Sequence, residues 1–251
     1  MSYIKPVFKC LDSYKKDFKN SQCLLTVSVG QEVHEGEKFE ATIDLVNQSF
    51  KSCILLVDDS LQRHTMALTS HQDAGSLYDY SLQLGDEWLK RNEKYIDKLT
   101  ILNQIIRWDR WLKHRDYHSQ QNLIKSTISN DIAYKLVFNE TITEFLRRYC
   151  LRLSENDKAN FSIERAHNLC LDYLIEECTA MCLWSEMTCH FEVYPSPRNL
   201  AMHETHQRFV VPQYPNLLHA VPIKFKNRKQ FKPQCFDFML TEDIFAEVVT
   251  G

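Results

Sequence analysis

Short apolar runs alternate with longer periodic segments along the first hundred residues. Three short, mainly apolar runs have the length and composition of strands: residues 23–27, 53–57 and 101–106. Three other segments space their apolar side chains as helices do: residues 37–50, 61–68 and 76–99. The side chains expected to face inward from the first and last of these helices are Phe39, Ile43, Val46 and Phe50, then Leu77, Tyr80, Leu84, Trp88 and Leu99. This alternation predicts an α/β fold with a parallel, doubly wound sheet flanked by helices.

The second half of the chain is mainly helical in its spacing. Residues 108–153 are expected to be mostly helix, and residues 161–184 to form another helix with Ser162 as its N-cap. Three further elements are expected: a strand at 187–194 that prolines end, a helix at 198–209, and a last strand at 220–226 that Pro222 places at an edge. We expect one domain over residues 1–251, with an N-terminal extension at 1–20 and a C-terminal tail at 231–251.

Composition narrows the class of protein. The chain is 44% hydrophobic and 25% charged, which is usual for a soluble globular protein. No apolar run approaches the roughly 20 residues of a membrane span, and residues 1–20 lack the apolar core of a signal peptide. We therefore expect a cytoplasmic protein without a membrane partner. A net charge of −3 excludes a generic polyanion binder, so nucleic acid would need a local basic patch.

The chain has nine cysteines but no CxxC pair. In a reducing cytosol these are expected to be buried thiols. A zinc site is the alternative interpretation of the loose cluster formed by Cys170, Cys178, Cys182 and Cys189.

Ser28 follows the first predicted strand, and ligands of open α/β sheets bind at the carboxyl ends of strands. It is a candidate nucleophile, with nearby amide groups to receive an oxyanion, and Gly30 lets the backbone approach a bound group. A turn or helix-cap role is the alternative.

Tyr173 and Glu177 stand four residues apart, so they share one face of an apolar helix. A carboxylate there could hold an ammonium group, or it could pair with an arginine or reach solvent. The neighbouring Glu176 leaves open which of the two glutamates faces water. Tyr194 ends a predicted strand and can offer its hydroxyl to a site, although an ordinary half-buried tyrosine is the alternative.

Together these residues resemble a known family. The resemblance lies in four stretches: Val-Ser-Val-Gly at 27–30, Val-Asp-Asp-Ser-Leu-Gln-Arg-His-Thr at 57–65, Tyr-Leu-Ile-Glu-Glu at 173–177 and Tyr-Pro at 194–195. From about residue 24 to 225 the chain resembles the cyclodipeptide synthases. Members of this family have a Rossmann-like core resembling the catalytic core of class I aminoacyl-tRNA synthetases, without the ATP-binding motifs, and this chain also has neither HIGH nor KMSKS. Gln31 and Pro195 stand where one subfamily has Asn and His, so the chain resembles the other subfamily, called XYP.

The resemblance implies an aminoacyltransferase that joins the amino acids of two aminoacyl-tRNAs into a cyclic dipeptide. Ser28 would attack the first ester and become an aminoacyl-enzyme, and Tyr173 and Glu177 would hold the α-amine. Glu177 would act either as the anchor of that amine or as the base that takes its proton. Tyr194 would assist proton transfer when the ring closes. No ATP, no metal and no other cofactor is expected, because the tRNA ester is already activated, and a monomer is expected.

The resemblance also implies residues that line the substrate site: Leu24, Thr26, Gly30, Gln31, Leu55, Val57, Leu174, Ile175, Glu176, Glu192 and Pro195. Our hypothesis is that Glu192 makes one side-chain pocket accept a polar or small residue; the alternative is that it pairs with a protein cation. The expected tRNA-binding residues form a stripe on the helix at 76–99, although such a stripe can also be a solvated face: Lys90, Arg91, Lys94 and Lys98.

Two other functions remain open at this stage. One is a serine hydrolase or acyltransferase in which Ser28 uses a histidine base, with His34, His64 and His203 as candidates. The other is a non-catalytic tRNA-binding protein of the same fold.

Overall fold

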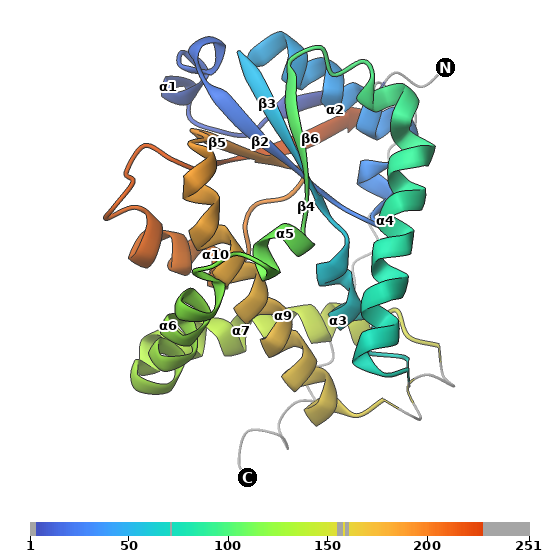
Figure 1. Cartoon of the computed structure of the whole chain (residues 1–251), viewed down its shortest axis with the longest axis vertical. Coiled ribbons are helices and arrows are strands. Elements are labelled where there is room, and N and C mark those ends of the chain that lie inside the picture. The colour runs from blue at the N-terminus through green and yellow to red at the C-terminus, as the bar shows by residue number, and fades with distance from the viewer. Residues whose placement is uncertain (1–3, 71, 155–157, 159–160, 228–251) are drawn as a thin grey trace, which may run out of the picture.

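A six-stranded sheet forms the centre of the molecule, with helices on both of its faces (Figure 1). The computed structural model describes residues 4–70, 72–154, 158 and 161–227. The strands are β1 (Ile4–Phe8), β2 (Gln22–Ser28), β3 (Ser52–Asp58), β4 (Leu102–Arg107), β5 (Phe191–Tyr194) and β6 (His219–Asn227). Their order is β1-β6-β5-β2-β3-β4, and every neighbouring pair is parallel except β1 with β6. The predicted α/β class is confirmed.

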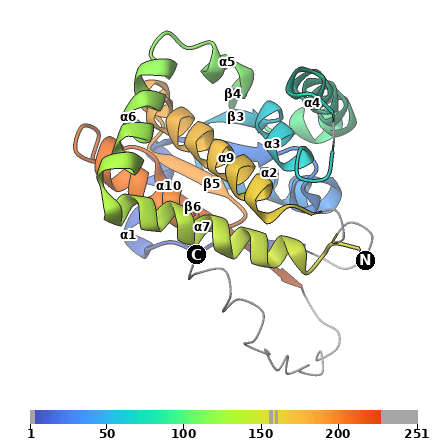
Figure 2. The ribbon, with the colours of Figure 1, turned by 90° about the horizontal axis from the view of Figure 1, so that it is seen from below.

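Two apolar cores lie on opposite faces of the sheet. The helices are α1 (Asp12–Lys15), α2 (Gly36–Ser49), α3 (Arg63–Met66), α4 (Ala74–Ile96), α5 (Asp109–Leu112), α6 (Tyr117–Asn130), α7 (Ile132–Cys150), α9 (Ile163–Leu183) and α10 (Leu200–Thr205). Helices α2 and α4 cover one face, where Phe39 and Trp88 are fully buried. On the other face α6, α7, α9 and α10 pack together, as Figure 2 shows from below. Ser162 caps α9 as expected, accepting a hydrogen bond from the Arg165 amide.

Strand alternation decides which side chains reach which core. In β2, Leu25 and Val27 point to the α2 and α4 face, whereas Leu24 points to the α9 face. The parallel register places Thr26 beside Leu56, and in the same way it pairs the two strand ends. Side chains of equal parity in β2 and β3 therefore share one face of the sheet.

The carboxyl ends of three parallel strands meet at one edge. Ser28 ends β2, Asp58 ends β3 and Tyr194 ends β5. The chain runs from β2 outward through β3 to β4 and then returns to the other side of β2, so the sheet changes direction between β2 and β5. Such a switch point is where open α/β sheets bind ligands.

Several sequence predictions are wrong in detail. The last strand is not an edge strand, because residues 4–8 of the expected N-terminal extension pair with it as β1. Pro222 is accommodated at the end of that ladder, where its carbonyl accepts from the Lys9 amide at 2.7 Å. Tyr80 is 48% exposed rather than inward. The strand expected from 187 begins at Phe191, because a 3-10 helix (Trp184–Met187) and Thr188 with a φ of 53° precede it.

The remaining expectations for the second half are met more closely. Residues expected to be helical at 198–209 form α10 and one turn of π-helix (His206–Val210). The expected tail at 231–251 lies outside the described residues. In the part of the chain that the structure describes, no helix has the length and apolar character needed to cross a membrane.

Candidate active site

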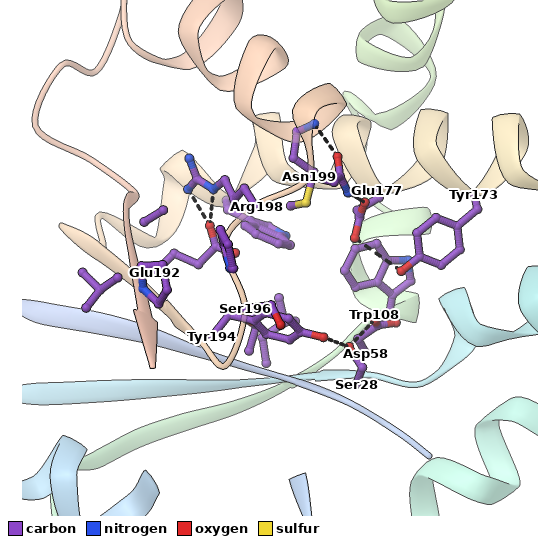
Figure 3. A pocket seen from close by; sticks show the side chains of 18 residues that line it. Ser28, Asp58, Trp108, Tyr173, Glu177, Glu192, Tyr194, Ser196, Arg198 and Asn199 are labelled. Atoms are coloured by element: carbon purple, nitrogen blue, oxygen red, sulfur yellow. Dashed lines mark hydrogen bonds and ion pairs between the residues drawn. The ribbon is translucent and has the colours of Figure 1, made fainter. Parts of the chain in front are cut away.

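The hydroxyl of Ser28 lies between two side chains at the edge of the sheet (Figure 3). Its Oγ is 3.1 Å from the Asp58 carboxylate oxygen Oδ2 and 3.1 Å from the Tyr194 hydroxyl. Ser28 is 8% exposed. The strand end thus presents a buried serine with two polar partners, as a candidate nucleophile requires.

The backbone around Ser28 is held by neighbouring groups. The Ser28 amide donates to His34 Nδ1 at 2.9 Å, and the Val29 amide donates to the Asp58 carbonyl at 3.0 Å. Gly30 has a φ of 86° and open space on its Cβ side, so the turn requires a glycine and leaves room for a ligand. Among the described residues, the Gly30 amide donates to no protein acceptor.

His34 supports the strand end and does not act on the hydroxyl. Burial lowers the pKa of His34 to about 4, so its ring is neutral near pH 7. Its Nδ1 lies 2.9 Å from the Ser28 amide nitrogen and 3.2 Å from the Ser28 carbonyl oxygen, so the ring contacts the Ser28 backbone rather than its hydroxyl. Of the other histidines that the sequence offered as bases, His64 lines the second cavity but its Nε2 contacts Glu176 at 3.2 Å, and His203 is an exposed residue of α10. A Ser–His hydrolase pair therefore finds no support here.

Asp58 is a buried carboxyl for which no role was predicted from the sequence. Its Oδ2 accepts from the Ser28 hydroxyl and from Gln62 Nε2, the latter at 2.8 Å. Burial raises the pKa of Asp58 well above its ordinary value, and the Glu177 carboxylate adds to this effect. Its position at a strand end was the only signal in the sequence.

Tyr173 and Glu177 point from α9 toward the same cavity (Figure 3). The Tyr173 hydroxyl donates to Glu177 Oε1 at 3.3 Å, and Asn199 Nδ2 donates to Glu177 Oε2 at 3.0 Å. Burial raises the pKa of Glu177 to about 7, and the Glu192 carboxylate contributes. Among the described residues, no arginine pairs with this carboxylate, which therefore suits an incoming ammonium group.

Glu176 does not line the cavity, contrary to the sequence expectation, and it does not face water. Its carboxylate accepts from both Nη atoms of Arg63, from Trp108 Nε1 at 2.9 Å, and contacts His64. Burial acts to raise the pKa of Glu176, but His64 and Arg63 outweigh it and hold the pKa below its ordinary value. The physical reason is helical geometry: consecutive residues project about 100° apart, so only Glu177 shares the face of Tyr173.

Two cavities meet at Ser28. One of about 200 Å³ is lined by Thr26, Ser28, Leu56, Asp58, Trp108, Tyr173, Glu177, Trp184, Glu192, Tyr194, Ser196, Pro197, Arg198, Asn199, Met202, Ala220, Val221 and Pro222. The other, of about 230 Å³, has a more apolar wall that includes Leu68, Ile142, Phe145 and Leu174. The two share Ser28, Tyr173, Tyr194 and Asn199. Two groups can therefore reach one hydroxyl from separate spaces.

The structure sorts the expected lining residues into three groups. Thr26 and Glu192 line the first cavity, and Gln31 and Leu174 line the second. Leu24, Ile175, Gly30 and Pro195 lie near the site but line neither cavity.

The expectation for Leu55 and Val57 is wrong. Both are fully buried in the core on the α2 and α4 face, on the far side of the sheet from Ser28. The parallel register of β2 and β3 is the reason, because Thr26 pairs with Leu56, so Leu56 faces the cavity and its neighbours face away.

Glu192 is paired with a protein cation inside the first cavity. Arg198 donates from Nε to Glu192 Oε2 at 2.6 Å, and the two side chains are only 6% and 5% exposed. Among the described residues, Glu192 Oε1 accepts no hydrogen bond from protein. The pair thus lines the cavity while keeping one carboxylate oxygen for a ligand (Figure 3).

Comparison with known proteins decides the family. No protein-family sequence model and no curated protein sequence matches the chain. A cyclodipeptide synthase structure from Fluoribacter dumoffii shares 42% sequence identity with it at a TM-score of 0.86, covering 91% of this chain and 100% of that one. The chain belongs to the cyclodipeptide synthase family.

Two more distant structures share the fold of this synthase. A cyclodipeptide synthase from Candidatus Glomeribacter gigasporarum, bound to Phe-tRNAPhe, has 15% identity and a TM-score of 0.71 over 94% of this chain and 100% of that one. A Mycobacterium tuberculosis protein, whose structure relates cyclodipeptide synthetases to type I tRNA-synthetases, has 8% identity and a TM-score of 0.60 over 88% and 91%. These matches concern the fold, and they agree with the expected likeness to the class I synthetase core.

The basic stripe on α4 consists of Lys90, Arg91, Lys94 and Lys98, and some of these cations already pair with carboxylates of the protein. Arg91 pairs with Glu35 at 2.8 Å, and Lys98 pairs with Glu40. Within the described ranges, Lys90 and Lys94 have no carboxylate partner, although Lys94 lies 4.7 Å from the centre of the Tyr95 ring. The stripe that the sequence predicts is therefore an exposed row in which two of four cations are already paired.

The cysteine cluster of the synthase is packed rather than gathered around a metal. Cys170, Cys178 and Cys189 belong to the core under α9, and Cys182 packs against it. Burial raises the pKa of Cys170, Cys182 and Cys189 to about 12, which disfavours the thiolates that zinc requires. Among the described residues, the group spaced closely enough to hold a metal is His114, Asp116 and Glu186, which includes none of these thiols.

Proposed function

We propose that this synthase joins the amino acids of two aminoacyl-tRNAs into a cyclic dipeptide through a covalent aminoacyl-enzyme on Ser28. The observation that carries the proposal is that two cavities share the Ser28 hydroxyl, together with Tyr173 and Tyr194. A single nucleophile reached from two spaces suits a ping-pong reaction in which two amino acids arrive in turn.

The first half of the reaction is acylation. Ser28 attacks the ester carbon of the first aminoacyl-tRNA, and the tRNA leaves. The α-ammonium group of the amino acid binds Glu177, whose carboxylate already accepts from Tyr173 and Asn199. The open Gly30 amide supports this step, since it can donate to the developing oxyanion.

The second half builds and closes the ring. The amine of the aminoacyl-enzyme attacks the ester of the second aminoacyl-tRNA, which releases that tRNA and gives a dipeptidyl-enzyme. The free amine of the dipeptide then attacks the Ser28 ester. Tyr194, whose hydroxyl is 3.1 Å from Ser28 Oγ, donates its proton to that oxygen as the product leaves, and the proton that the amine loses restores the Tyr194 phenol. Burial raises the pKa of Tyr194 to about 12, so it acts in its protonated form.

We further assign the synthase to the XYP subfamily. Gln31 and Pro195 at the two subfamily-defining positions support this assignment. Pro195 offers no side chain for proton transfer beside Tyr194, so the hydroxyls and carboxyls around Ser28 carry the protons.

The tRNA is proposed to contact the exposed row on α4, and the protein to act as a monomer. The Phe-tRNAPhe complex of the distant synthase supports tRNA as a ligand of this fold. Lys90 and Lys94 are the free cations of the row, so they are the residues we assign to phosphate contact.

Glu192 is proposed to select a polar or small amino acid in the first cavity. Its free Oε1 can accept from a side chain, and leaving that buried oxygen without a donor is unfavourable for an apolar substrate. We expect Glu192→Leu to shift the products toward larger apolar residues, with Glu186→Leu, a surface glutamate outside the cavity, as the control. An unchanged product spectrum in Glu192→Leu would remove this assignment.

The covalent intermediate provides the direct test of the mechanism. Purified wild type incubated with a mixture of aminoacyl-tRNAs is expected to gain the mass of one aminoacyl group on the peptide that carries Ser28. The Ser28→Ala variant is expected to bind tRNA and gain no mass. Mass gain elsewhere, or retained synthesis in Ser28→Ala, would contradict the proposal.

A further inference from the structure

A serine nucleophile must lose its proton as it forms a bond to carbon, and the acceptor must lie within hydrogen-bond reach. The Ser28 hydroxyl has two such neighbours, Asp58 Oδ2 and the Tyr194 hydroxyl, each at 3.1 Å. No histidine nitrogen contacts this hydroxyl within the described ranges, since His34 is committed to the Ser28 backbone. The neutral phenol is a poor base, so a single carboxylate remains as the acceptor.

We propose that Asp58 is the general base that takes the Ser28 proton when the enzyme is acylated. This inference rests on the proposed function, since it assigns the proton of that same covalent step. Asp58 contacts the reacting oxygen itself, so it is a catalytic residue rather than a group acting through another.

The hydrogen bonds around Asp58 fix the direction of transfer. Gln62 Nε2 can only donate, and it donates to the same Oδ2 that faces Ser28. Both hydrogen bonds act to lower the pKa of Asp58, although burial outweighs them and the pKa is raised on balance. When Ser28 donates to Asp58, the Tyr194 hydroxyl donates to Ser28 Oγ, so the phenol donates to the serine hydroxyl and the hydroxyl donates to the carboxylate. The chain of donors thus ends at Asp58.

The charges that face Asp58 suit this role. Glu177 from α9 and the adjacent Asp59 are like charges, and Tyr173 and Tyr194 are neutral phenols nearby. Burial and these carboxylates raise the pKa of Asp58, which makes it a stronger base than an exposed aspartate. The α-ammonium group that binds at Glu177 brings a positive charge, which favours the ionised form of Asp58 at the moment of attack.

The step balances without any further reactant. Ser28 Oγ forms a bond to the ester carbon while its proton moves to Asp58 Oδ2, and the carbonyl becomes an oxyanion. The intermediate then collapses, the bond to the ribose oxygen breaks, and that oxygen takes the proton from Asp58. Asp58 ends the step ionised, and the products are the Ser28 ester and free tRNA.

Asp58→Asn is the discriminating variant, because the asparagine amide oxygen can still accept from Ser28 and Gln62 but cannot take a proton. The measurement is the single-turnover rate of aminoacyl transfer to Ser28, using aminoacyl-tRNA with a radiolabelled amino acid. We expect Asp58→Asn to lose about 10²- to 10⁴-fold in this rate, as removal of a general base does. The matched control is Asp86→Asn, a carboxyl of α4 that is 69% exposed and contacts Arg107 rather than Ser28; we expect its rate to stay within about threefold of wild type.

A thiol nucleophile separates a base from a structural support. Cysteine ionises far more readily than serine, so it depends less on a neighbouring base. We expect Asp58→Asn to cost at least about tenfold less in a Ser28→Cys background than in the Ser28 background. Equal losses in both backgrounds, or acylation by Asp58→Asn within about threefold of wild type, would overturn the inference.

The proposed function can fail separately from this inference. A folded wild type that gains no label on Ser28 would reject the covalent mechanism, and the inference with it. A wild type that is labelled, beside an Asp58→Asn variant labelled at the same rate, would reject the role of Asp58 alone. Thermal unfolding of each variant shows whether a lost rate reflects lost fold.

Discussion

Gly85 lies where α4 passes closest to the sheet, and its replacement by alanine is expected to destabilise the protein. A Cβ built on Gly85 would lie 2.5 Å from Asp59 Oδ2 and 2.6 Å from Arg107 Nη2, whereas ordinary contact begins at 3.4 Å. Asp59 is fully buried and forms an ion pair with Arg107. The added methyl group must therefore displace a buried ion pair rather than a flexible surface side chain.

Two opposing effects set the size of the change. Replacing glycine by alanine inside a helix gains about 1 kcal/mol from helix propensity. Disrupting a buried ion pair costs about 3 to 5 kcal/mol. We therefore expect Gly85→Ala to lower the free energy of unfolding by about 2 to 4 kcal/mol. For a chain of this size that corresponds to a fall in Tm of about 5 to 15 °C.

Thermal unfolding followed by circular dichroism measures this change. The matched control is Gly75→Ala in the exposed first turn of the same helix, where the nearest atom to a Cβ is a side-chain oxygen of Asp73 at 3.2 Å. We expect the control to change Tm by no more than about 2 °C, because the weakened N-cap hydrogen bond from Ser76 to Asp73, worth about 1 kcal/mol, is offset by the helix propensity of alanine. A Gly85→Ala protein as stable as wild type would refute the close packing of α4 on the Asp59–Arg107 pair.

Three further predictions concern the site and its surface. The folded protein holds the Glu177 proton up to a pKa of about 7, against 4.5 ordinarily, so wild type loses stability as pH rises through this window. At pH 8 the Glu177→Gln variant should therefore have a higher free energy of unfolding than wild type, by up to about 3 kcal/mol, and this difference should disappear near pH 4.5. A difference that does not change with pH would contradict the raised pKa of Glu177. Tyr194→Phe should slow ring closure more than acylation, so that aminoacyl- or dipeptidyl-enzyme accumulates in quenched reactions; equal slowing of both steps would count against its role as proton donor. Lys94→Ala should raise KM for aminoacyl-tRNA and reduce the salt dependence of KM by about one unit of log–log slope. Lys98→Ala should have a smaller effect, because Lys98 is already paired with Glu40. A larger effect of Lys98→Ala would exclude the free cations as phosphate contacts.

The sequence predicts the inner strands and the long helices because their patterns are unambiguous. The apolar runs that became β2 and β3 are buried on both faces, so nothing polar interrupts them. The helix carrying Tyr173 and Glu177 repeats its apolar residues over six turns and begins at a serine cap. These local signals suffice to place Ser28 at a strand end and both α9 residues on one face.

The sequence fails where long-range pairing decides the outcome. Residues 4–8 have no strong strand pattern, and they form β1 only because β6 offers an open edge more than two hundred residues later. The prediction that Leu55 and Val57 line the site was wrong because a shift of one residue along a strand moves a side chain to the opposite face of the sheet. No local pattern distinguishes Leu55 from Leu56.

The polar partners of the site were missed for a similar reason. Asp58 belongs to the stretch at 57–65 that resembles the family, but its contact with Ser28 depends on the β2–β3 register. Asn199 and Arg198 reach Glu177 and Glu192 only after the chain turns between β5 and α10. Such contacts between distant segments carry no mark in a single sequence.

Mass spectrometry of the culture medium tests the central claim most directly. Bacteria expressing the wild type and, separately, the Ser28→Ala variant would be compared. We predict new masses that match cyclic dipeptides in the wild-type medium alone, and these masses would also name both amino acids. A soluble, well-expressed wild type that adds no such mass, or a Ser28→Ala variant that makes the same product, would contradict cyclodipeptide synthesis on Ser28.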